Sequence, residues 1–322
     1  MPGYLINRFV QMFMVLGIMS FVIYGLIGLM PGDPVDLMIS ADPNLTAEDA
    51  KRLYHLYGLD LPITTRYANW LQAVMGGDLG FSRLHGKPVL DAIAPALMNT
   101  AKLLGLSFGL SIIIGLLAGI WASSKPYSAT DYAINLAAFA GISIPSFWLA
   151  LLLIIFFSVI LGVLPAGGIG DVFSDGGWWG SAKYLVLPVT SLTIASVGSH
   201  TRYMRASMIE VLRQDYIRTA RAKGLSRSQT LFRHALRNAM IPVVTIVALD
   251  FGFLFSGALI TETVFAYPGM GKLIFDSIMG NDFNLALATL LFATALTLLG
   301  NFAADMAYAS LDPRIKFRGE RS

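Results

Sequence analysis

This sequence of 322 residues contains no cysteine and few charged residues. The absence of cysteine excludes disulfide bonds, thiol catalysis and cysteine-ligated metals. The four histidines, at positions 55, 85, 200 and 234, show no metal-ligand spacing. Charged residues make up 13% of the chain, against about 25% in soluble domains, while 55% are hydrophobic and the mean hydropathy is +0.64. The composition predicts an integral membrane protein with all-α structure, since long apolar runs span bilayers as helices.

Six apolar runs approach or exceed the roughly 20 residues that a helix needs to cross a bilayer. They cover residues 9–30, 100–122, 133–161, 184–203, 241–264 and 285–308. The first run is too long for a signal peptide, and no small-residue cleavage site follows it. We therefore expect it to remain as an anchor and predict six transmembrane helices.

Charge placement predicts which side each loop occupies, because short basic loops stay in the cytoplasm. Lys125, a basic block around Arg218 and the basic tail mark the inside, so both termini are expected there. The predicted organisation is an anchor (1–30), an extracytoplasmic helical loop (31–98), a core membrane domain (99–310) with a cytoplasmic loop (204–240), and a cytoplasmic tail (311–322). Within the outer loop, Thr46 and Asp49 form a candidate capping pair, and Gly58 is expected to end the helix.

The cytoplasmic loop carries the most informative pattern in the chain. From Arg202 to Arg237 there are nine lysines or arginines and only two acidic residues. Gly224 is placed to end one helix and Ser226 to begin the next. Such a helix–glycine–helix element predicts a docking surface, with Tyr216, Ile217, Leu225, Leu231 and Phe232 as apolar contacts. The alternative is that the charges only set topology and bind anionic lipid, at about 1 kcal/mol each.

Acidic residues inside apolar runs are costly and need a partner or a watery cavity. Asp250 lies in the fifth run and Glu262 near its end. We expect Asp250 to line a translocation path, with an interhelical hydrogen bond as the alternative. Glu262 is a second candidate for this path, as a gate or loop anchor near the outer surface.

Two short motifs are not interpreted as catalytic. Ser107 lies between Gly105 and Gly109 like a hydrolase nucleophile, but it falls within an apolar run. There the GxxxG spacings of the pairs Gly105–Gly109 and Gly115–Gly119 predict a close-packing helix face instead. The sequence from Gly269 to Lys272 lacks the spacing of a phosphate-binding loop. No nucleotide or metal site is therefore expected in this chain, and no basic, aromatic-rich face suggests nucleic-acid binding.

Several segments together resemble one family, the membrane subunits of ATP-binding-cassette importers, and within it the dipeptide, oligopeptide and nickel branch. These segments are YIRTARAKGL (216–225), RNAMIP (237–242), VFAYPGMGKL (264–273), LDPRIKF (311–317), MPGDP (30–34) and GDLGFS (77–82). Relative to the general signature, Arg218 replaces Glu and Thr219 replaces the first Ala, departures that the peptide branch shares. Asn281 and Asn284, which flank Asp282, depart from the residues common in similar chains.

The resemblance implies a type I importer permease fold in a bacterial inner membrane, and a transport subunit rather than an enzyme. Its implied partners are a second homologous permease, an extracytoplasmic solute-binding protein and two cytoplasmic ATPases that bind ATP and Mg. It also implies short peptides as cargo; nickel or another small solute, a stand-alone secondary transporter and a membrane protease are the alternatives. The residues expected to couple this chain to the ATPases are Asp215, Tyr216, Ile217, Arg218, Thr219, Ala220, Arg221, Ala222, Lys223, Gly224 and Leu225.

Overall fold

The computed structural model describes residues 2–29, 46–56, 58–170, 178–253 and 258–311, together with Val35 and Ile39. The described chain is almost entirely helical and divides into two compact units. One contains Met1–Thr100 and Pro268–Leu298, and the other Ala101–Tyr267 and Leu299–Ser322. The predicted segment MPGDP and the tail after Leu311 lie outside the described residues.

The first unit contains the amino-terminal helix and the predicted outer loop. Its elements are α1 (Pro2–Gly28), α3 (Ala47–Leu56), α4 (Ile63–Met75), a hairpin of β1 (Phe81–Ser82) and β2 (Lys87–Pro88), the start of α5 (Val89–Ser124), α13 (Met270–Met279) and the start of α14 (Phe283–Leu311). The predicted capping pair is confirmed: the Thr46 amide donates to Asp49 Oδ2 over 3.1 Å, and the Asp49 amide donates to Thr46 Oγ1 over 3.3 Å. The Thr46 hydroxyl, followed by its amide, lowers the pKa of Asp49 below its usual range.

A buried carboxylate joins two distant segments of the first unit. Asp282 accepts hydrogen bonds from Ser82 Oγ (2.7 Å), the Leu84 amide (3.0 Å) and the Leu285 amide (3.3 Å). The GDLGFS segment is thereby tied to the last predicted outer loop, 200 positions away. Nearby, the Asn284 side chain donates to the carbonyl of Phe81 over 3.2 Å. Asn284, a departure from similar chains, thus has a structural role of its own.

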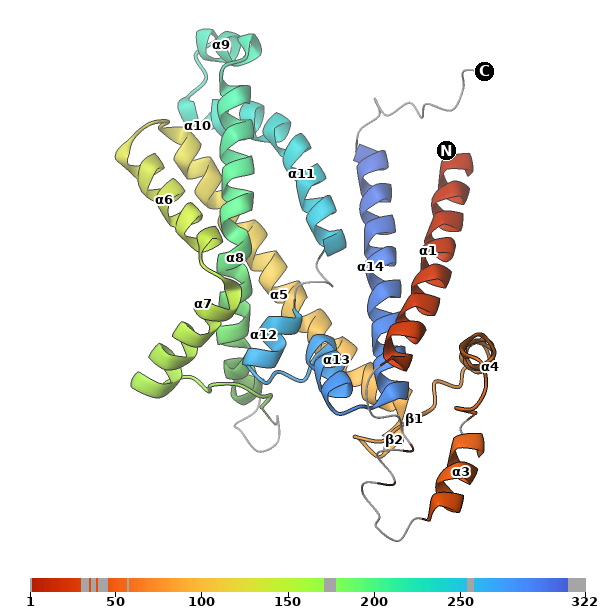
Figure 1. The fold of residues 1–322 in the computed structure, drawn as a ribbon. Helices are drawn as coiled ribbons and strands as arrows, with labels where there is room; N and C mark the ends of the chain where they lie inside the picture. Colours follow the sequence, from red (N-terminus) through yellow and green to blue (C-terminus); the bar gives the residue numbers. More distant parts are fainter. Residues whose placement is uncertain are drawn as a thin grey trace. The chain divides into compact units, whose positions relative to one another are not determined.

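The second unit is a helical bundle around α8 (Trp178–Leu212). The helices α6 (Ala129–Ser143), α7 (Ser146–Leu153) and α11 (Leu236–Phe253) pack against it (Figure 1). Shorter elements complete this unit: a π-helical turn at Ile154–Ile160, α9 (Asp215–Ala222), α10 (Arg227–Gln229), a second π-helical turn at Thr230–Ala235 and α12 (Leu259–Val264).

Glycines bring α5 directly against α8. A Cβ on Gly119 would lie 2.7 Å from Met204 Cβ and 2.7 Å from the Thr201 carbonyl oxygen, and one on Gly115 would lie 2.6 Å from His200 Cβ. By contrast, a Cβ on Gly109, in the same helix, would have no atom within 4 Å. The second of the two predicted glycine pairs therefore makes the close helix contact.

Three described helices are long and apolar enough to cross a membrane: Ile6–Gly28, Val89–Ser124 and Phe283–Met306. A fourth apolar stretch consists of Ala129–Ser143 and Ser146–Ile160, which meet at a bend of 100°. The bend differs from the straight third span that the sequence predicts, and its cause is local. Ile144 precedes Pro145 and is extended (φ −83°, ψ 124°), which is the conformation that a proline favours in the residue before it.

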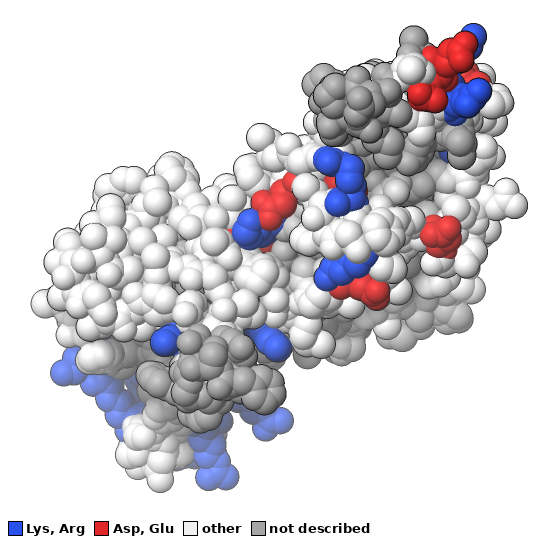
Figure 2. Space-filling view, turned by 90° about the horizontal axis from the view of Figure 1, so that it is seen from below, with Lys and Arg blue, Asp and Glu red and all other residues white. Residues whose placement is uncertain are grey.

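On the face shown in Figure 2, charged side chains form separate groups on a largely uncharged surface.

The two remaining predicted spans coincide with helices of the second unit. Residues 184–203 lie within α8, which is 35 residues long but more polar than the helices above. Residues 241–264 divide between α11 and α12, and residues 254–257 between them lie outside the described part of the chain. A count of six spans stays a prediction.

Candidate functional site

The most distinctive surface of the second unit is α9, the helix predicted for docking. It crosses one end of α8 (Figure 1). Its inner face consists of Ile217, which is 0% exposed, and Ala220, which is buried as well. Ile217 packs in one apolar cluster with Met204 and Met208 of α8 and with residues of α11 and the turn before it. Ile217 is therefore an anchor for α9, and the prediction that it is an available apolar contact is wrong.

The carboxyl end of α9 closes in the geometry known as a Schellman motif. The Leu225 amide donates to the Ala220 carbonyl over 3.3 Å, and the Gly224 amide to the Arg221 carbonyl over 3.0 Å. Gly224 has a φ of +82°, which glycine adopts without strain. A Cβ at this position would have no atom of this chain within 4 Å. The glycine is thus needed for its backbone conformation, and its outer side is open.

The outer face of α9 is polar and mainly basic. Asp215 and Arg218 form an ion pair of 3.2 Å, but both side chains are well exposed, so the pair adds little stability. Leu225 is half-buried beyond the helix. The remaining predicted coupling residues are exposed: Tyr216, Thr219, Arg221, Ala222, Lys223 and Gly224.

The segment after Gly224 begins with the capping residue that the sequence predicts. The Ser226 hydroxyl accepts from the Gln229 amide over 3.2 Å, and the Gln229 side chain accepts from the Ser226 amide over 3.0 Å. Arg227 donates to the carbonyl of Ser124 at the end of α5. Consequently, the segment that follows α9 contacts a second helix of the unit.

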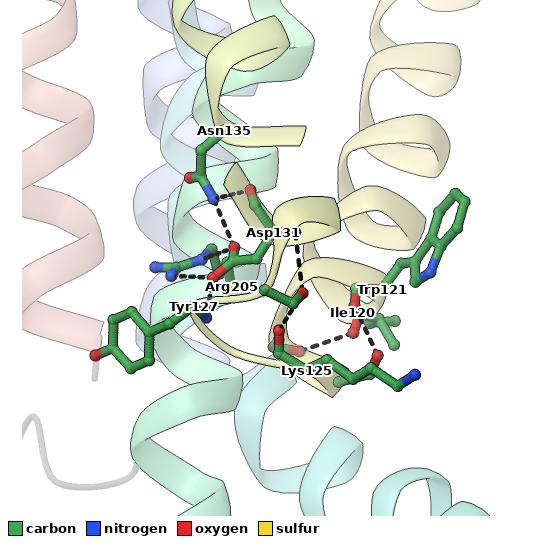
Figure 3. Close-up of polar contacts among 10 residues, drawn as sticks. Ile120, Trp121, Lys125, Tyr127, Asp131, Asn135 and Arg205 are labelled. Atoms are coloured by element: carbon green, nitrogen blue, oxygen red, sulfur yellow. Dashed lines mark hydrogen bonds and ion pairs between the residues drawn. The ribbon is translucent and has the colours of Figure 1, made fainter. Parts of the chain in front are cut away.

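A buried ion pair near the loop after α5 was not predicted from the sequence. Asp131 on α6 is 1% exposed, and its two carboxylate oxygens accept from Nε and Nη2 of Arg205 on α8, both over 2.6 Å (Figure 3). The same carboxylate accepts from the Asn135 amide group over 2.7 Å and from the Tyr127 backbone amide over 2.8 Å. One available signal was the spacing of Ser128 and Asp131, since Ser128 is the N-cap of α6.

The two acidic residues proposed for the translocation path occupy different surroundings. Asp250 on α11 lines a cavity of about 350 Å³, and its side chain is 42% exposed. Its Oδ2 lies 3.1 Å from Nε2 of His200 on α8. Glu262 on α12 is fully buried and is not among the residues that line this cavity. Within the described residues, no three histidine, aspartate or glutamate side chains gather as a metal site.

Together these features define a multi-pass helical membrane protein with an amphipathic helix exposed at one end of its bundle. The chain belongs to the family of binding-protein-dependent transport system inner membrane components, whose core region matches residues 111–317 and whose amino-terminal region matches residues 1–100. It is therefore a subunit of a transport system in the inner membrane.

Curated relatives match the chain over nearly its whole length. The oligopeptide transport system permease protein AppB of Bacillus subtilis is 38% identical over 98% of this chain and 100% of its own length. The dipeptide transport system permease protein DppB of Alkalihalophilus pseudofirmus is 36% identical over 98% of this chain and 100% of its own length.

Solved structures share the fold. A chain of the MetNI methionine ABC transporter in an inward-facing conformation aligns with a TM-score of 0.55 and 19% identity, over 68% of this chain and 95% of that one. A chain of an amino acid ABC transporter crystallised with histidines aligns with a TM-score of 0.53 and 14% identity, over 69% of this chain and 94% of that one. The chain thus has the fold of ABC importer permeases.

Proposed function

We propose that this chain is the membrane-spanning subunit of an ATP-driven importer for short peptides. Peptide cargo is supported by the sequence identity of this chain to two permeases. Over 98% of its length, the chain is 38% identical to a protein named an oligopeptide permease and 36% identical to one named a dipeptide permease. Six spans with both termini in the cytoplasm would place α9 on the cytoplasmic side. A second homologous permease, two ATPases that bind ATP and Mg, and a solute-binding protein complete the proposed complex.

The anchored geometry of α9 is the observation that carries the proposed coupling. Ile217 fixes the helix to a cluster that also contains Met204 of α8 and Val243 of α11. A partner that binds the outer face therefore cannot displace α9 without moving the ends of these long helices. ATP binding to the partner would bias an inward-open and outward-open equilibrium through contacts that differ between the two states.

Affinity purification of the tagged chain from detergent-solubilised membranes tests the assignment. We expect a second permease and ATPase subunits to co-purify, and peptide-loaded binding protein to stimulate hydrolysis. A single subunit that transports without ATPase after reconstitution would instead identify a secondary transporter. If nickel-loaded rather than peptide-loaded binding protein stimulates hydrolysis, the cargo assignment is wrong.

Two substitutions on adjacent residues of α9 separate docking from folding. Tyr216→Ala removes an exposed aromatic group and should lower stimulated ATPase activity at least ~tenfold, as truncation of an interface aromatic often does. It should leave the thermal stability of the isolated chain unchanged. Ile217→Ala, the comparison variant, removes a buried side chain and should lower the free energy of unfolding by ~2–5 kcal/mol. Unchanged ATPase activity in Tyr216→Ala would argue against docking through this face.

Gly224→Asp tests the helix end. An aspartate adds bulk and negative charge at the open side of a basic segment, and we expect it to abolish ATPase coupling while membrane insertion persists. Gly224→Ala adds only a methyl group and backbone strain of roughly 1 kcal/mol, so it shows how much of the loss is strain. Full transport by Gly224→Asp would contradict the proposal.

A further inference from the structure

We infer that the cavity beside Asp250 binds a cationic group, and that the ammonium group at the amino terminus of a peptide occupies it during transport. The cationic preference follows from the cavity alone, whereas its peptide occupant rests on the proposed function. The cavity is formed by residues of α5, α8 and α11 that all belong to the second unit. Its lining residues are Leu104, Ser107, Phe108, Leu192, Ala195, Ser196, Ser199, His200, Tyr203 and Asp250.

The charge of the lining has one sign. Asp250 is its acidic member, and the described lining residues include no lysine or arginine. The other polar members are serine and tyrosine hydroxyls, which can accept a hydrogen bond from an ammonium group, and the His200 imidazole. A carboxylate surrounded by such acceptors attracts a cation and repels an anion.

The geometry of His200 leaves the negative charge of Asp250 available. The imidazole is 3% exposed, and its Nε2 faces the carboxylate of Asp250. Its other nitrogen, Nδ1, is buried and has no hydrogen-bond partner among the described residues. With hydrogen on Nε2 alone, the ring donates to Asp250 and leaves the charge of the carboxylate uncancelled.

The neighbours of His200 hold the pair in place. The ring of Phe108 on α5 packs edge-on against the imidazole, with centroids 6.0 Å apart. Gly115, also on α5, lets His200 approach that helix closely, since a Cβ there would lie 2.6 Å from His200 Cβ. With the imidazole fixed on one side, Asp250 keeps a half-exposed side toward the cavity. A fixed acceptor with one open side is suited to a ligand that carries several N–H donors.

The absence of native cysteine in this chain allows a direct test of the cavity charge. Ser196 lines the cavity four residues before His200, on the same face of α8. In a Ser196→Cys variant of the full chain in membranes, we would compare modification by a cationic and an anionic methanethiosulfonate reagent, each normalised to a free thiol in solution. We expect the cationic reagent to react about tenfold faster, because a nearby carboxylate favours one reagent and disfavours the other.

Three further variants test whether Asp250 is the cause. Adding Asp250→Asn, which keeps an acceptor for His200, should bring the reagent ratio close to one, whereas Asp250→Glu should retain the preference. A Ser228→Cys chain supplies an exposed control thiol beside Arg227, and its ratio should not respond to Asp250→Asn. A ratio near one in the chain with Asp250 intact, or no change with Asp250→Asn, would overturn the inference.

Protection by peptide tests the occupant. A dipeptide with a free amino terminus should slow modification of Ser196→Cys, while its N-acetylated form at the same concentration should not, and Asp250→Asn should remove the protection. Equal protection by both peptides, or by neither, would overturn the ammonium assignment. The labelling experiment needs neither ATP nor partner subunits, so a negative result in it does not contradict the importer proposal. Conversely, a failure of ATPase subunits to co-purify does not contradict the inferred charge of the cavity.

Discussion

The carboxylate of Asp131 links α6 to α8 through its ion pair with Arg205, and it accepts hydrogen bonds from two further groups. Removing one member of a buried ion pair leaves the other without compensation, which costs about 3–5 kcal/mol. Arg205 keeps 23% exposure, so water reduces that penalty and the lower end of the range applies.

We therefore expect Asp131→Asn to lower the free energy of unfolding by about 3 kcal/mol, measured by thermal or denaturant unfolding in detergent. Asp215→Asn is the matched control, because it removes the same charge from an exposed pair and should change stability by less than ~1 kcal/mol. Equal stability of the two variants would show that the Asp131 pair contributes no more than a surface ion pair.

Asp282 has a comparable role in the first unit, where it accepts three hydrogen bonds from two separate segments. Ser82→Ala removes one donor to a charged acceptor, and we expect a loss of about 1.5–3 kcal/mol in stability. Protease sensitivity of the chain before and after this substitution checks the expectation. Ser143→Ala is the control, because it removes only a hydroxyl that bonds to its own helix. If the Ser143→Ala chain is as sensitive to protease as the Ser82→Ala chain, the expected role of the Ser82–Asp282 bond is contradicted.

At the scale of elements, the contact between α5 and α8 depends on the small size of two glycines. Gly119→Ala would place a methyl group 2.7 Å from atoms of α8, and overpacking of this kind costs ~1–3 kcal/mol. Gly109→Ala lies on the same helix, meets open space and should be neutral or stabilise by up to ~1 kcal/mol. Unfolding of both variants in a denaturing detergent series measures the difference, and loss of stability in Gly109→Ala alone would reverse the assignment.

At the scale of the whole molecule, the proposed topology places the outer loop and the basic segment on opposite sides of the membrane. Single cysteines at His85 and Ser228, both exposed, would test it in the cysteine-free chain. We expect an impermeant maleimide added outside spheroplasts to label the first and to label the second only after permeabilisation. Labelling of both from the outside would rule out the cytoplasmic position of α9.

The sequence alone predicted much of what is local. Apolar runs indicate helices because a chain in lipid must satisfy its backbone hydrogen bonds internally. The capping boxes at Thr46 and Ser226 and the helix end at Gly224 are likewise readable, since each rests on groups a few residues apart. Short segments spread along the chain, among them 216–225 and 264–273, carry the family resemblance that the family match confirms.

Tertiary structure decided which of these residues face the protein and which face outward. Ile217 resembles a contact residue in sequence but is an anchor, because the apolar stripe of α9 packs on α8. The pairs Asp131–Arg205 and His200–Asp250 join residues 74 and 50 positions apart, and the Ser82–Asp282 bond joins residues 200 apart. Such pairs arise from helix packing, which depends on side-chain size and shape over the whole bundle rather than on any local pattern.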